Sequence, residues 1–226
     1  MFNGCTSLVT APELPATTLA EWCYAYMFNG CTSLVNAPTL SATTLANECY
    51  RNMFDGCTSL VTAPELPATT LGVGCYLWMF NGCTSLVNAP NLPATTLSVL
   101  CYAQMFSGCT SLEICPTISA TTLASDCCLL MFHNCTALSS LPKLLATSLP
   151  LWCYAGMFYE CSNIKLSETQ TEEYQYPYRI PASGTGIDTS GQTNGALDEM
   201  FGGTGGTFTG TPSINTTYYT SNTIVE

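Results

Sequence analysis

Residues 1–26 read MFNGCTSLVTAPELPATTLAEWCYAY, and this stretch is written six times along the chain. The Met-Phe pair that opens it returns at a constant interval, at Met27, Met53, Met79, Met105, Met131 and Met157. A constant period of this length is typical of proteins built from stacked coils, because each coil buries its apolar side chains against its neighbours. The repeat therefore predicts a solenoid, in which equivalent residues of successive copies lie over one another.

Aligning the copies places apolar residues in columns, which we expect to become continuous ladders. Four such columns begin with Phe2, Leu8, Leu14 and Leu19, and each continues with one residue in every later copy. A coil has too little apolar surface to form a core by itself, so the ladders are expected to be the core of the whole stack.

Each coil is predicted to hold a short strand and a short helix. The segment 7–14 (SLVTAPEL) reads as extended, and its proline, which has no N–H to donate, keeps the strand short. Leu19, Cys23 and Met27 then follow at intervals of four residues, which places them on one face of about two helical turns. Gly4 and its equivalents stand where such a helix needs a left-handed exit. The expected fold class is therefore an α/β repeat.

The composition changes beyond the seventh Met-Phe pair. This predicts a solenoid at residues 1–164, with six full copies and a partial seventh, and a C-terminal capping region at 165–226. Residues 174–180 alternate with the period of two that is typical of a strand. Residues 196–206 (ALDEMFGGTGG) match the repeat around Met-Phe, so we expect a degenerate coil after an insertion of 17 residues. The segment 182–195 between them is rich in Gly, Ser and Thr and is predicted to be a loop.

The charge of the chain excludes several classes of partner. Its net charge is −11, it has only four Lys and Arg residues, and 8% of its residues are charged, against a usual value of about 25%. Nucleic-acid binding requires Lys or Arg at several phosphates, and anionic membrane surfaces attract basic segments, so neither partner is expected. No run approaches the roughly 18 apolar residues of a membrane span, and no membrane insertion and no cofactor are predicted.

The fifteen cysteines allow three interpretations, namely buried thiols, disulfides or metal ligands. Thirteen of them fall in two columns of the repeat, which begin with Cys5 and Cys23 and lie in apolar segments. Their total is odd, so at least one thiol stays unpaired, and the single histidine, His133, cannot complete repeated zinc sites of the usual Cys and His spacing. We favour buried thiols, because free Cys is among the most often buried residue types.

No catalytic constellation is found, and the chain is not expected to be an enzyme. His133 lies in a column that otherwise holds Asn, Asp, Ser and Tyr, which indicates an exposed turn residue. Polar and acidic residues from Asp188 to Glu199 have the spacing of a calcium loop, but Thr193 stands where that loop requires glycine. We interpret this match as chance.

Columns that differ between copies are expected to face solvent, and two such sets of columns contain all three tryptophans. Both lie on the predicted helical side. Exposed aromatic residues beside polar groups are typical of surfaces that bind proteins or sugars, and the alternative is that they cover the helix edges. A rival surface is the polar ladder of the strand side, which begins with Thr10 and Glu13. The predicted ligand-binding residues are Trp22, Tyr26, Arg51, Trp78 and Trp152, and no catalytic or metal-binding residue is predicted.

The motif MFxGCTSL, followed by a proline-bearing strand and a second Leu turn, resembles the BspA-like leucine-rich repeats, in particular their MFxxCxSL branch. The resemblance covers residues 1 to about 164. Two features differ, because the period is longer than that of the common form and the strand carries Ala-Pro in place of a β-branched pair. The resemblance implies a right-handed leucine-rich-repeat solenoid on a bacterial surface, which adheres to host proteins or to other cells and has no catalytic residues.

Two functions follow as hypotheses. The first is a non-catalytic module at the cell surface or outside the cell, which binds a host or bacterial surface protein or a glycan. The alternative is a structural segment of a larger assembly, such as a phage tail fibre or a surface stalk. Because Met1 stands at a coil boundary with no capping repeat before it, we expect the chain to be part of a longer protein.

Overall fold

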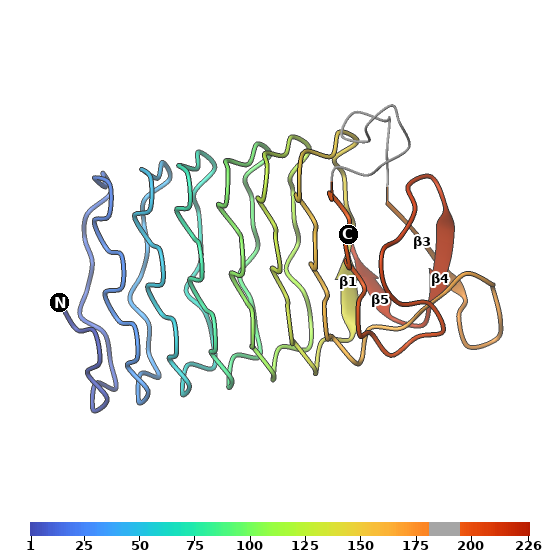
Figure 1. The fold of residues 1–226 in the computed structure, drawn as a ribbon. Coiled ribbons are helices and arrows are strands. Elements are labelled where there is room, and N and C mark those ends of the chain that lie inside the picture. The colour runs from blue at the N-terminus through green and yellow to red at the C-terminus, as the bar shows by residue number, and fades with distance from the viewer. Residues whose placement is uncertain (181–194) are drawn as a thin grey trace.

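A computed structural model describes residues 1–180 and 195–226. The copies of the repeat form coils that lie side by side in one stack (Figure 1). The stack runs from the N-terminus at one end to β3 (Tyr176–Arg179) and β4 (Thr217–Thr220) at the other. Backbone hydrogen bonds join successive coils, such as the bond from Phe2 N to Met27 O at 3.0 Å. Equivalent residues of successive copies therefore lie over one another.

The predicted content of each coil, a short strand followed by a short helix, is wrong, and so is the α/β fold class. The residues described contain no helix. They contain five short strands, which are β1 (Ser140–Pro142), β2 (Leu166–Ser167), β3, β4 and β5 (Thr223–Val225). Most of each coil consists of turns and of extended segments that pair at single positions.

Consecutive turns occupy the segment that the sequence predicts to be helical. Cys23 N and Ala25 N donate to the carbonyl three residues earlier, at 3.2 and 3.3 Å, whereas Tyr24 N donates to Cys49 O of the next coil at 2.9 Å. An α-helix would use successive N–H groups within the segment, and a helix of two turns is marginal by itself. The next coil offers an acceptor at every second residue, so the turns replace the helix.

The predicted strand at 7–14 is reduced to single bridges in most coils. Thr10 pairs with Asn36, and Thr62 pairs with Asn88, both in parallel. The proline two residues after each of these positions has no N–H to donate, so the pairing does not extend as a regular ladder.

The core consists of ladders of equivalent side chains, as the columns predict. Neighbouring rings of the Phe column, from Phe2 to Phe158, are stacked with centroids 5.5–5.7 Å apart. Leu34 and its equivalents in the central coils have no exposed surface. A ladder of tyrosines from Tyr24 to Tyr102, which the sequence interpretation did not include, is also stacked, with centroids 5.8–6.0 Å apart.

All fifteen cysteines are free thiols, and the expected burial is confirmed for thirteen of them. Cys31 Sγ donates to Phe2 O at 3.0 Å, and the same bond recurs in the five coils that follow. These thiols therefore help to join one coil to the next. Cys5 and Cys23 are exposed, because the first coil packs against a neighbouring coil on one side only.

The C-terminal region covers the last full coil by taking the place of another one. β5 pairs in parallel with β1, where the extended segment of a further copy would lie. Residues 196–204 continue the turns, since Phe158 N donates to Met200 O at 2.9 Å and the ring of Phe201 stacks on that of Phe158 at 5.5 Å. These residues belong to the segment that the sequence matches to the repeat. The strand expected at 174–180 is β3, and β4 lies between β2 and β3 in an antiparallel sheet.

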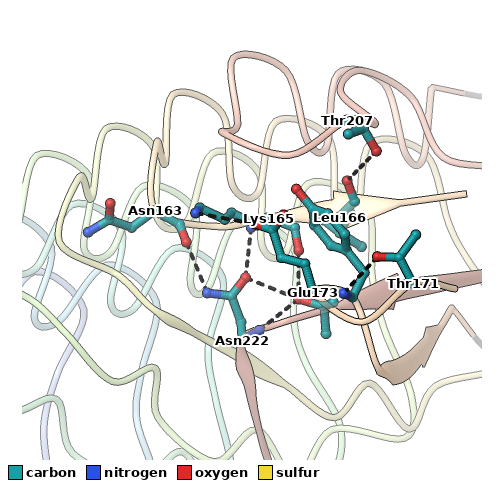
Figure 2. A network of polar contacts seen from close by, with 9 residues as sticks. Asn163, Lys165, Leu166, Thr171, Glu173, Thr207 and Asn222 are labelled. Atoms are coloured by element: carbon teal, nitrogen blue, oxygen red, sulfur yellow. Dashed lines mark hydrogen bonds and ion pairs between the residues drawn. The ribbon is translucent and has the colours of Figure 1, made fainter. Parts of the chain in front are cut away.

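Asn222 holds this region to the stack (Figure 2). Its Nδ2 donates to Ser139 O at 3.0 Å and to Asn163 O at 2.9 Å. Its Oδ1 accepts from Lys165 N at 2.7 Å and from Thr220 Oγ1 at 3.0 Å. One buried amide thus connects β4 and β5 to two coils of the repeat.

Replacing Asn222 with alanine is expected to lower the free energy of unfolding by about 2 kcal/mol, because polar partners lose their hydrogen bonds in a largely buried place. Chemical denaturation measures this change. Asn36→Ala is the matched control, since Asn36 is exposed and its side chain donates to Thr10 Oγ1 alone at 3.2 Å, and a change within about 0.5 kcal/mol is expected there. Equal losses in the two variants would contradict the role given to Asn222.

Candidate functional site

The turn segments line one face of the stack, and one backbone conformation recurs there at fixed positions in every coil. In each coil three positions four residues apart have a positive φ, as at Trp22 (61°), Tyr26 (56°) and Gly30 (70°). The left-handed conformation expected at the glycines is confirmed, but the other two positions in each coil carry many residue types. We call this surface the turn face. The predicted binding residues Trp22, Tyr26, Trp78 and Trp152 all stand at such positions.

Three of the five predicted residues come together on the turn face of the first three coils. The Arg51 guanidinium carbon lies 5.6 Å from the ring centroid of Trp22 and 5.1 Å from that of Trp78. A cation placed over an aromatic face is attracted by the ring quadrupole. Trp22 remains 52% exposed. The result is a stack of indole, guanidinium and indole in which Trp22 is exposed and Arg51 and Trp78 are partly buried.

Polar side chains fix Arg51 in this place. Its Nη1 donates to Glu48 Oε2 at 3.0 Å and its Nε to Asn52 Oδ1 at 3.4 Å. Asn52 Nδ2 in turn donates to Asp55 Oδ2 at 2.8 Å. Asp55 also accepts from the amides of Asn29 and Asn81 in the two adjacent coils, both at 2.9 Å. The sequence analysis did not identify these supporting residues. A column that holds Asn, Asp and His in different copies predicts exposed turn residues and gives no sign of hydrogen bonds between coils.

The backbone at these tryptophans is unfavourable for a bulky side chain. A left-handed residue other than glycine costs roughly 1–2 kcal/mol, and the equivalent positions hold Gly74 and Gly156 in other coils. Glycine would therefore satisfy the backbone at Trp22 and Trp78 at lower cost. The same conformation occurs at these positions with residues such as Glu48, Leu100 and Gln104, so it belongs to the repeat and not to the tryptophans.

The other two predicted residues lie apart from the stack of rings. Tyr26 belongs to the first coil and is 36% exposed, and its backbone N donates to Arg51 O at 2.9 Å, but its ring makes no recorded contact with the guanidinium. Trp152 is 47% exposed and lies in the sixth coil, where its indole packs over Gly195. Trp152 is therefore not part of the cluster.

The rival surface on the strand side is a shallow groove. Asn36 Nδ2 donates to Thr10 Oγ1 at 3.2 Å, so the polar ladder satisfies part of its own hydrogen-bonding capacity. A hollow of about 350 Å³ lies between the second and third coils, lined by Asn36, Thr62 and the exposed Val35 and Val61. This groove has no aromatic or charged side chain in its lining, and so it offers less for recognition than the turn face.

His133 lies farther along the turn face in a line of polar groups. Its Nδ1 is 3.2 Å from Ser107 Oγ and its Nε2 is 3.3 Å from Glu160 Oε2. It is partly exposed, less so than expected for a turn residue. Ser107 is only 6% exposed, so its hydroxyl is covered and offers no open position for a substrate.

Part of the sequence interpretation falls outside the described residues. The loop predicted at 182–195 lies there except for its last residue. The calcium-loop spacing that starts at Asp188 lies there up to Asn194.

No family model, no curated protein and no solved structure matches this chain. In the parts of the chain that the structure describes, no helix has the length and apolarity needed to cross a membrane.

Proposed function

We propose that the protein is a non-catalytic binding module of the cell surface or extracellular space, which adheres to a surface protein or a glycan. The observation that carries this proposal is the stack of the exposed Trp22 on the partly buried Arg51 and Trp78. The motif likeness to BspA-like repeats agrees with it, because the signature residues of that motif form the core and leave the exposed columns free to vary. The acidic charge of the chain directs it away from nucleic acid and anionic lipid.

The arrangement suits recognition for two physical reasons. Trp and Arg are among the residue types that most often dominate binding energy at interfaces. Here the hydrogen bonds to Glu48 and Asn52 already hold the guanidinium between the rings. A ligand that covers Trp22 and Trp78 therefore meets a surface that is ordered before binding, which reduces the entropy cost of association.

The proposal is tested with a panel of immobilised glycans and extracellular matrix proteins. Trp22→Ala and Trp78→Ala are each expected to weaken binding to the recognised member at least tenfold, which corresponds to about 1.4 kcal/mol. Trp152→Ala is the matched control, because Trp152 is similarly exposed and also has a positive φ but lies outside the cluster. We expect that variant to bind like the unaltered protein.

Two results would argue against this function. Unchanged binding by Trp22→Ala and Trp78→Ala would remove the cluster from the binding surface. Binding to no member of the panel would favour the alternative, a structural segment of a larger assembly.

A further inference from the structure

A cavity of about 400 Å³ opens on the turn face near its C-terminal end, several coils away from the Trp22–Arg51–Trp78 cluster. Gly156 is part of its lining, at a position where other coils carry Tyr26, Asn52, Trp78, Gln104 and Leu130, all with positive φ. The Leu130 side chain occupies the place that a side chain at 156 would take, since a Cβ on Gly156 would lie 2.5 Å from Leu130 Cδ2. The lining residues come from three successive coils of the stack.

The floor and the rim of this cavity differ in character. Leu129, Leu130 and Ala155 supply an apolar floor, and the rings of His133 and Tyr159 stand at one side with centroids 5.8 Å apart. The exposed residues Asp198 and Glu199 are on the opposite coil and complete the lining.

The charge around the cavity has one sign. Asp198 and Glu199 line it, and Glu160 lies next to it, 3.3 Å from His133 Nε2. None of the four Lys and Arg residues of the chain is among the lining residues. Three of these four have their own carboxylate partner, in the pairs Arg51 with Glu48, Lys143 with Glu226 and Lys165 with Glu173. The carboxylates at the cavity are thus without a cationic partner other than His133 within the described chain.

We propose that this cavity binds the side chain of a lysine in a protein ligand. The four methylene groups of lysine match the apolar floor, since long cationic side chains bury their stems and keep the charged end at the surface. The ammonium group then meets Asp198 and Glu199 at the rim and the ring of Tyr159 at the side, and a cation near a Tyr face is attracted to it. The net charge of −11 favours the approach of a basic partner.

The site is separate from the Trp22–Arg51–Trp78 cluster, so this proposal does not depend on the proposed function. It adds a second contact site for the ligand of the proposed binding module. A ligand that presents a lysine at the cavity and an apolar or saccharide surface at the cluster would bridge several coils.

The test uses three pentapeptides and the full chain, with Gly-Gly-X-Gly-Gly as the common sequence. X is lysine, norleucine or glutamate, so norleucine keeps the stem and removes the ammonium group. Nuclear magnetic resonance titration at about 0.15 M ionic strength, where exposed charges are screened beyond roughly 8 Å, gives both the affinity and the residues affected. The lysine peptide is expected to bind with a Kd on the order of 1 mM, to shift signals of Leu129, Leu130 and His133, and to bind at least tenfold more tightly than the other two.

Two variants separate the contributions of rim and floor. The double variant Asp198→Asn with Glu199→Gln keeps the shape of both side chains and is expected to weaken binding of the lysine peptide about tenfold. Gly156→Gln is expected to abolish binding, because a Cβ there would lie 2.5 Å from Leu130 Cδ2 and would push that side chain out of its place in the lining. The matched control is Glu13→Gln with Glu21→Gln, which changes the net charge equally at two exposed carboxylates of the first coil.

The outcomes are decisive in either direction. Equal binding of the lysine and norleucine peptides, shifts confined to residues outside the cavity, or equal weakening by the control pair would each overturn the proposal. Loss of lysine binding in the cavity variants alone, with glycan or matrix binding at Trp22 unchanged, supports it independently of the other site.

Discussion

Raising the pH above about 9 is expected to destabilise the protein steadily and to unfold it within about two to three pH units. Burial raises the pKa of the thiols of Cys57, Cys115 and Cys161 from an ordinary value of 9.0 to about 12. Burial also raises the pKa of the tyrosines in the core ladder, as at Tyr76 and Tyr102. An ionised thiolate or phenolate would have no water in these places, so the folded chain retains the proton.

The sign of the effect follows from linkage. A group whose pKa is higher in the folded than in the unfolded chain stabilises the fold fully below the unfolded value, and this stabilisation is lost as the pH rises toward the folded value. Each such thiol removes roughly 1.4 kcal/mol of stability per pH unit within that window. Three thiols together remove about 4 kcal/mol per unit, and a domain of ordinary stability, about 5–15 kcal/mol, has little left after two or three units.

Chemical denaturation at a series of pH values from 8 to 12 measures the slope, with these limits set by the folded and unfolded pKa values. Reaction with a thiol reagent at about pH 8 is the control. Cys5 and Cys23 are exposed and are expected to react at once, whereas the thirteen buried thiols react only when the chain unfolds. A free energy of unfolding that is constant across this window would show that the thiols are not protonated in an apolar core.

Phe80→Ala is expected to lower the free energy of unfolding by about 3–5 kcal/mol, as is typical when a fully buried ring is removed. Phe80 has no exposed surface, and it stacks on Phe54 and on Phe106 with centroids 5.5 Å away on each side. Its loss opens a cavity in the middle of the ladder and removes two ring contacts at once.

Phe2→Ala provides the matched control at the end of the same ladder. Phe2 is partly exposed and stacks on Phe28 alone, at 5.6 Å, so a loss below about half that of Phe80→Ala is expected. Thermal and chemical unfolding of the two variants give the comparison. If both variants lost the same stability, the ladder would not act as a continuous core.

The repeat period alone was sufficient to predict the core. Phe2, Leu34 and their equivalents lie in ladders because a constant repeat length brings identical side chains into register, whatever the local backbone does. The wrong prediction of a helix rests on the same regular spacing of apolar residues. The apolar positions Leu19, Cys23 and Met27 satisfy a helical spacing of four, but a turn repeated every four residues satisfies it equally, and only the acceptors of the next coil decide between them.

The candidate site was predicted in part. Trp22, Arg51 and Trp78 were among the residues named, and the structure brings them together. The expectation that variable columns face solvent was right for Trp22 but wrong for Asn52, Leu77 and Ala103, which are buried. The contact of Arg51 with the two tryptophans depends on three different columns in three successive coils, which no periodicity within one copy reveals. Trp152 stands in the same column as Trp22 but lies three coils away from Trp78. Membership of a column therefore does not show which coils form one site. The cavity lined by Gly156 was missed, because its lining residues come from three coils and no single column indicates it.

The hydrogen bonds of the turn face have one direction. From Trp22 N to Gly30 N, each second N–H of a coil donates to the coil that follows it. On the strand side the bonds run both ways, since Val35 N donates to Val9 O of the preceding coil. Peptide dipoles that point the same way add up along an axis, so the turn face, unlike the strand side, carries a dipole along the stack.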